Sequence, residues 1–143
     1  MKKSTNIEII CGLLILLFVY TAVSKLLAYT SFVAVLDQSP LMQGKAGVIG
    51  WLLPTVELFV SILLFLPSTK EVGLYLSFGL MVLFTAYIAY MVMFTPHLPC
   101  SCGGVIKQLS WKQHLVFNAF FILVAFAGII MFRNKNLAKH QTQ

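Results

Sequence analysis

Apolar residues fill four long stretches of the chain, which are separated by short segments rich in proline, glycine and charged residues. Each stretch is apolar on nearly every side and reaches about 20 residues, the length that a helix needs to cross a hydrocarbon core of about 30 Å. Isolated strands would leave backbone groups unpaired in lipid, so helices are the expected state. The predicted helices lie near 7–29, 48–66, 73–95 and 112–132.

The connecting segments contain residues that interrupt helices, among them Ser39, Pro40, Gly44, Pro67, Pro96 and Pro99. Ser110, followed three residues later by Gln113, resembles a capping box that opens the fourth helix. Residues 30–38 fit a short helix in the membrane interface and a plain loop equally well. The sequence therefore predicts four spanning helices and leaves this segment open.

The composition agrees with a membrane protein. Of the 143 residues, 59% are hydrophobic and 10% are charged, and the mean hydropathy is +0.92. A soluble domain carries about 25% charged residues, so this chain could not cover a water-exposed surface. We expect an all-α integral membrane four-helix bundle, with residues 1–143 as one domain and a polar cytoplasmic tail over 133–143 that frays.

Basic residues predict the orientation in the membrane. One side of the predicted bundle carries Lys2, Lys3, Lys70, Arg133, Lys135 and Lys139. The opposite side carries Lys45, Lys107 and Lys112, with Lys25 near it. Because the more basic side usually faces the cytoplasm, both termini are expected there, in a bacterial inner membrane, with the loop after the third helix in the periplasm. The basic residues form no face with interleaved aromatics, so we expect lipid and no nucleic acid as a partner.

The loop after the third helix contains two cysteines one residue apart, within His97-Leu98-Pro99-Cys100-Ser101-Cys102-Gly103-Gly104. At this spacing a disulfide forms only in a compact turn, which strains the bond and makes it labile. Gly103 and Gly104 give the backbone freedom to form such a turn, and a protonated His97 would favour a thiolate. Cys100 and Cys102 are therefore the candidate catalytic residues, with His97, Gly103 and Gly104 in support.

Two other interpretations of the cysteine pair remain open. A permanent structural bridge across one residue would constrain almost no chain entropy, although it would act as a local brace. A metal site needs about four ligands, which His97 and His114 would complete with the two cysteines. The usual ligand knuckle is CxxC rather than CxC, so we assign no metal ligands.

Lys25 and Glu57 are ionisable residues inside the first and second predicted helices. Charged groups at membrane depth are costly and are candidates for function. One interpretation is a structural ion pair in which the lysine reaches toward the interface. The other is a role in proton handling or in contact with a quinone. Cys11 lies about 30 Å from the loop by bilayer thickness and is expected to be a helix-packing residue.

Three motifs carry a resemblance to a known family: Tyr20-Thr21-Ala22-Val23-Ser24-Lys25-Leu26, Leu53-Pro54-Thr55-Val56-Glu57-Leu58 and Pro99-Cys100-Ser101-Cys102-Gly103-Gly104. The chain resembles the DoxX-like superfamily, and within it the MauE group of four-helix methylamine-utilisation membrane proteins. The resemblance implies a periplasmic thioredoxin-like partner and a role in maturing disulfide-containing exported proteins. In the methylamine pathway the implied client is the small subunit of the dehydrogenase.

We therefore expect an inner-membrane protein that exchanges disulfides through Cys100 and Cys102. Whether it turns over as a thiol–disulfide oxidoreductase is left open, as are the direction of electron flow and membership of a larger membrane complex. A quinone is a candidate cofactor, and no cofactor is assigned, because other four-helix redox bundles carry two cysteine pairs and this chain has one. The alternatives are a non-catalytic assembly or structural subunit and a metal-binding membrane protein.

Overall fold

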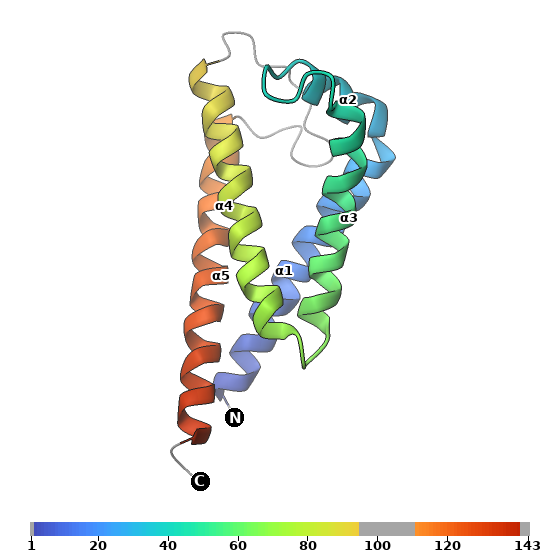
Figure 1. Ribbon diagram of the computed structural model, residues 1–143. Helices are drawn as coiled ribbons and strands as arrows, with labels where there is room; N and C mark the ends of the chain where they lie inside the picture. Colours follow the sequence, from blue (N-terminus) through green and yellow to red (C-terminus); the bar gives the residue numbers. More distant parts are fainter. Residues whose placement is uncertain (1, 95–110, 141–143) are drawn as a thin grey trace.

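The structure is a computed structural model that describes residues 2–94 and 111–140. These residues form five α-helices and no strand: α1 (Lys2–Leu27), α2 (Tyr29–Asp37), α3 (Ala46–Phe65), α4 (Lys70–Phe94) and α5 (Trp111–His140) (Figure 1). The all-α membrane bundle expected from the sequence is confirmed. The cysteine loop and the proposed cap Ser110 lie outside the described residues.

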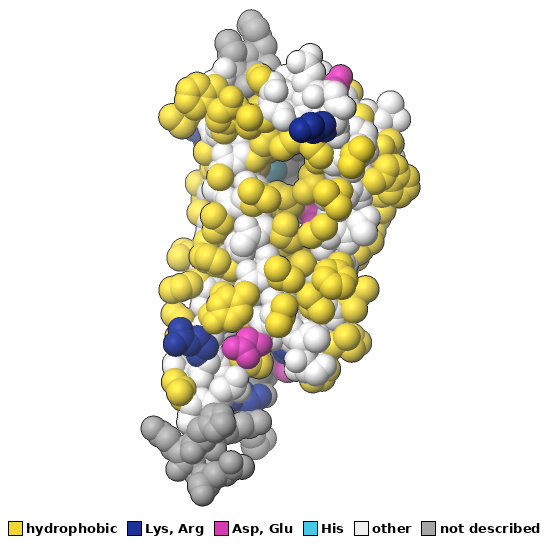
Figure 2. All heavy atoms as spheres, in the orientation of Figure 1, with side chains coloured by type: hydrophobic (Ala, Val, Ile, Leu, Met, Phe, Trp, Pro, Cys, Tyr) yellow, Lys and Arg dark blue, Asp and Glu magenta, His cyan; other side chains and the backbone are white. Residues whose placement is uncertain are grey.

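Four of the helices are long and apolar enough to cross a membrane: Thr5–Leu27, Ala46–Phe65, Lys70–Phe94 and Lys112–Ala138. Large apolar side chains stand exposed at mid-helix, including Leu16, Leu83 and Leu123, each at least 60% exposed. Figure 2 shows that apolar side chains cover most of the middle of one face, whereas charged groups gather toward its ends. Such a surface suits lipid tails, so the chain is a multi-pass membrane protein.

The long helices pack mainly as two pairs, α1 with α3 and α4 with α5. Figure 1 shows the pairs close together at the end that holds both termini and farther apart toward α2. At the terminal end, the buried core includes Ile7, Leu14, Leu64, Leu74 and Ala125. The apolar contacts are thus concentrated in one half of the bundle, and the other half has room for the site described below.

Two glycines allow close approaches between helices in the half of the bundle near the termini. A Cβ atom on Gly73 would lie 2.9 Å from the backbone nitrogen of Leu64, and one on Gly128 would lie 2.9 Å from Cγ2 of Ile10. Small residues let membrane helices come near enough for their backbones to pack. Gly73 therefore fixes the spacing of α3 and α4, and Gly128 that of α1 and α5.

Residues 30–38, for which the sequence favoured neither a short helix nor a loop, lie almost entirely in the helix α2. Phe32, Val35 and Leu36 form the buried face of α2, and this face packs beside Ala46 and Leu53 of α3. Burial of an apolar stripe explains why a helix forms here rather than a loop. After α2 the chain turns at Gly44, whose φ of +77° is rarely adopted by other residues, and the backbone N–H of Gly44 donates to the Asp37 carboxylate over 3.1 Å.

The helix α5 differs from the prediction at its end. The tail that was expected to fray from Arg133 is helical as far as His140. Phe132, Lys135 and Asn136 of this last part line a hollow together with Ile7 of α1, so one face of the extension has a neighbour. Packing against the start of α1 accounts for helix where composition alone suggested a loose tail.

Candidate functional site

A pocket of about 130 Å³ lies inside the bundle, lined by residues from all five helices. It uses the later part of α1, one face of α2, the middle of α3, the later half of α4 and the start of α5. These segments belong to the half of the molecule away from the termini (Figure 1). The pocket therefore occupies the region where the two helix pairs diverge.

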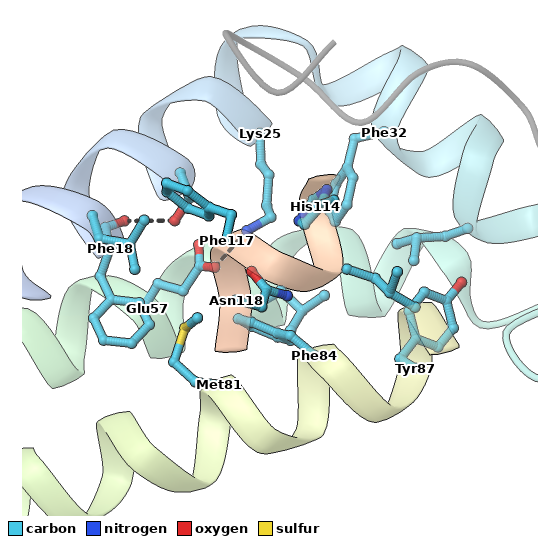
Figure 3. A pocket seen from close by; sticks show the side chains of 15 residues that line it. Phe18, Lys25, Phe32, Glu57, Met81, Phe84, Tyr87, His114, Phe117 and Asn118 are labelled. Atoms are coloured by element: carbon cyan, nitrogen blue, oxygen red, sulfur yellow. Dashed lines mark hydrogen bonds and ion pairs between the residues drawn. The ribbon is translucent and has the colours of Figure 1, made fainter. Parts of the chain in front are cut away.

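Its walls are mainly aromatic and aliphatic, with Phe18, Phe32, Phe84, Phe117, Met81 and Ile88 among them. A smaller polar set shares the space: Thr21, Lys25, Glu57, Tyr87, His114 and Asn118. Figure 3 shows Lys25, Glu57, His114 and Asn118 around a common space, with Phe84 and Phe117 beside them. Convergent polar groups in an apolar cavity are the usual composition of a small-molecule site.

Lys25 and Glu57 form an ion pair between α1 and α3, through Nζ and Oε1 (Figure 3). Their side chains are 20% and 1% exposed, respectively. The Lys25 ammonium also lies 5.3 Å from the Phe84 ring centre and 5.9 Å from that of Phe32, within cation–π range. The structure thus joins the two charges that the sequence singled out, and surrounds the cation with aromatic rings.

The second carboxylate oxygen of Glu57, Oε2, is buried and accepts no hydrogen bond within the described part of the chain. Thr21 lines the same pocket; its hydroxyl donates to the Phe18 carbonyl over 3.2 Å and also lies near the Glu57 carboxylate. Buried polar atoms nearly always have a partner. One strong acceptor at the pocket therefore remains available.

Sequence reasoning did not find the whole polar set. It considered His114 only as a metal ligand and did not single out Asn118 or Tyr87. His114 and Asn118 stand four residues apart on α5, so they share one helix face. A pair of polar residues at this spacing in an apolar spanning helix is a signal that could have identified them.

The cysteine pair itself lies outside the described residues, as do His97, Gly103 and Gly104. In the chain, this segment joins the end of α4 at Phe94 to the start of α5 at Trp111. Within residues 2–94 and 111–140, no cluster of three His, Cys, Asp or Glu side chains could hold a metal. Cys11 is 2% exposed in the core beside Ile7 and Leu14, as expected of a packing residue.

A second lysine–glutamate pair occupies the opposite end of the bundle. Lys70 of α4 donates to both carboxylate oxygens of Glu8 on α1, each over 2.7 Å. The side chain of Glu8 is 60% exposed, unlike that of Glu57, whereas the side chain of Lys70 is 9% exposed. This pair therefore serves as an internal comparison for the buried one.

The fold and the site define a multi-pass membrane protein that encloses a small polar cluster inside an apolar helical bundle. Residues 3–131 match the family model described as methylamine utilisation protein MauE, and the chain belongs to this family. The DoxX-like superfamily is a looser relation. Comparison with curated proteins and with solved structures gave no match.

Proposed function

We propose that this MauE-family protein is an inner-membrane thiol–disulfide exchange protein. Cys100 and Cys102 exchange disulfides with a periplasmic thioredoxin-like partner and so support the maturation of exported proteins. Family membership is consistent with a membrane accessory role in methylamine utilisation. The observation that carries the proposal is the polar pocket, whose α4 and α5 walls lead into the two ends of the cysteine segment.

The exchange uses the ordinary chemistry of thiolates. A thiolate of the partner attacks one sulfur of the Cys100–Cys102 disulfide, which forms a mixed disulfide and releases the other cysteine as a thiolate. The second partner thiol then attacks the mixed disulfide. The partner leaves with a disulfide, and both cysteines remain as thiols. The reverse sequence moves a disulfide from the partner to this protein.

The predicted orientation supports this chemistry. If the side with fewer basic residues faces outward, then the segment between α4 and α5 lies in the periplasm, where disulfides form and persist. The ion pair between Lys25 and Glu57 holds α1 against α3 at this end of the bundle. The same ion pair therefore stabilises the part of the bundle that contains both the pocket and the helix ends next to the cysteine segment.

Thiol trapping tests the proposal. The single variants C100S and C102S should each block the resolving step or the attacking step, so at least one should accumulate a mixed disulfide with a periplasmic protein. The adduct would appear on non-reducing gels and be identified by mass spectrometry. The double variant C100S/C102S should form none, whereas the matched control C11A should behave like the wild type, because Cys11 is buried in the core.

The alternative roles give different results in the same strains. A non-catalytic assembly subunit with a local brace would show no adduct in either single variant and normal client maturation in the double variant. A metal-binding protein would contain zinc or copper in stoichiometric amount by elemental analysis. Either result would refute the exchange proposal.

A further inference from the structure

We infer that the pocket between α1, α3, α4 and α5 binds the ring of a membrane-soluble quinone. This inference deepens the proposed function, because it names the class of molecule that exchanges electrons with the cysteine pair. The binding site consists only of described residues. Binding itself does not require the cysteines, so the two proposals can fail separately.

The size of the pocket suits a single ring. Its volume is about 130 Å³, and an apolar cavity of about 150 Å³ accommodates benzene. Phe84 and Phe117 stand beside the polar groups (Figure 3), and their rings can pack against a flat ring by offset or edge-to-face contact. A one-ring head group is therefore a better fit than a bulky ligand.

The polar groups match the two oxidation levels of such a ring. The carbonyl oxygens of a quinone need hydrogen-bond donors when they are buried, and Lys25 is a permanent donor at the pocket. His114 and Asn118 add further donors from α5, across from the helices of the ion pair. The hydroxyl groups of the reduced form need acceptors, and Oε2 of Glu57 is a buried acceptor with no partner in the described chain.

The depth of the pocket indicates a ligand that arrives through lipid. Glu57 lies near the middle of the spanning helix α3. Figure 2 shows a hollow in one face of the molecule, bordered by apolar side chains, with a histidine side chain at its base. An isoprenoid tail can lie against that apolar border while the ring enters, whereas a highly charged water-soluble ligand would have to cross it.

A purely structural ion pair explains fewer of these observations. A bond between α1 and α3 requires one oxygen of Glu57 and no cavity. Leaving the second oxygen buried without a partner destabilises the fold, and an apolar pair of similar volume would hold the helices at least as well. A ligand that bonds this oxygen accounts for both the cavity and the unpaired acceptor.

The redox step balances with the proposed exchange. Two cysteine thiols lose two electrons and two protons as two S–H bonds break and one S–S bond forms. The quinone gains two electrons and two protons, forms two O–H bonds and returns to the bilayer as quinol. A labile disulfide has a relatively oxidising potential, so its formation needs an oxidising acceptor. Glu57 and His114 are the pocket groups that can relay the protons.

The direct test is binding of a benzoquinone that carries one isoprene unit. The protein is purified in nanodiscs as the cysteine-free variant C11A/C100S/C102S, because thiols add covalently to quinones. We expect saturable binding of one molecule per chain by equilibrium dialysis. H114A should weaken quinone binding about tenfold or more, the factor expected for losing a hydrogen bond to a buried polar group. E57Q should weaken binding of the corresponding quinol by a similar factor, because only the hydroxyl groups of the reduced form donate to Oε2 of Glu57.

The matched control is E8Q, which removes the carboxylate of the lysine–glutamate pair at the opposite end of the bundle and should leave the quinone affinity unchanged. A second pocket variant, L53F, keeps the ion pair and fills space at the pocket wall; it should abolish binding while the protein stays folded. Absence of saturable binding to the parent protein would overturn the inference. So would equal quinone affinity in the parent, H114A and L53F.

A redox measurement separates this inference from the proposed function. In protein that retains Cys100 and Cys102, L53F should slow quinol formation from added quinone at least tenfold. Combined with C100S or C102S, L53F should still allow the mixed disulfide with the partner to accumulate. Unchanged quinol formation in L53F refutes the pocket as the quinone site. Absence of the mixed disulfide from both single variants, C100S and C102S, with quinone binding intact, refutes the exchange and leaves the pocket assignment standing.

Discussion

Lys25 and Glu57 make one ion pair but stand in different surroundings. Glu57 is 1% exposed, whereas Lys25 is 20% exposed and lies on the last turn of α1. Without its partner, the lysine can extend its stem and move its ammonium toward the interface. The carboxylate has no such route, because its short side chain starts from the middle of α3. The loss of stability on breaking the ion pair should therefore depend on which of the two residues is replaced.

We expect K25M to destabilise the protein by about 3 kcal/mol, the cost typical of leaving one buried charge unpaired. E57Q should cost less, about 1 to 2 kcal/mol, because the remaining ammonium is partly exposed. The double variant K25M/E57M should recover part of the loss. Reversible unfolding in mixed micelles measures all three, and a larger loss in E57Q than in K25M would contradict this account.

The pair between Lys70 and Glu8 should behave differently. Lys70 is only 9% exposed, whereas Glu8 is 60% exposed. Removing the lysine therefore leaves behind a carboxylate that water can solvate, and exposed charges contribute about 0 to 1 kcal/mol. We therefore expect K70M to change stability by less than about 1 kcal/mol in the same unfolding measurement. A loss as large as that of K25M would show that the depth of the carboxylate does not control the energetics.

At the scale of the helices, hydropathy alone placed the four spanning segments within a few residues of their observed bounds. This worked because crossing lipid demands a long apolar run whatever the neighbouring helices do. The same signal did not decide α2, where burial of Phe32 and Leu36 against α3 selects the helix. It also missed the end of α5, where contacts with α1 matter more than composition.

Two glycines of α4 provide a matched test of helix packing. A Cβ on Gly73 would press against backbone atoms of Leu64 and Leu63, whereas a Cβ on Gly79 would meet nothing within 4 Å. We expect G73A to destabilise the protein by about 1 to 3 kcal/mol, the range for overpacking. G79A should be neutral or stabilising by up to about 1 kcal/mol, since alanine favours helix. Equal changes in stability for G73A and G79A would mean that α3 and α4 can move apart enough to accommodate the added methyl group.

At the scale of the whole molecule, the sequence indicated Lys25 and Glu57 as separate candidates and suggested that they pair. It did not show that His114 and Asn118 join them, because that juxtaposition depends on how α5 rotates and on where the two helix pairs separate. Apolar helices in lipid have little periodicity to mark the inward face. The pocket was therefore beyond sequence reasoning, although its individual polar residues were visible.

The orientation of the bundle can be tested at two exposed positions. In a cysteine-free background, Q43C lies after α2 and S68C lies in the turn between α3 and α4, at the opposite ends of α3. A thiol reagent that cannot cross the inner membrane should label Q43C in intact cells and S68C only after permeabilisation, because basic residues favour the cytoplasm. The reverse labelling pattern would place the cysteine segment in the cytoplasm.

Pro54 gives α3 a mechanical property that the other spanning helices do not share in their described parts. Proline has no N–H, so the carbonyl of Gly50 loses its usual helical donor. A helix bends most readily where its hydrogen-bond ladder is interrupted. The segment that carries Leu53 can therefore swing relative to the segment that carries Glu57. Bending at Pro54 can therefore change the width of the pocket beside the Glu57 carboxylate while every turn of α3 stays helical.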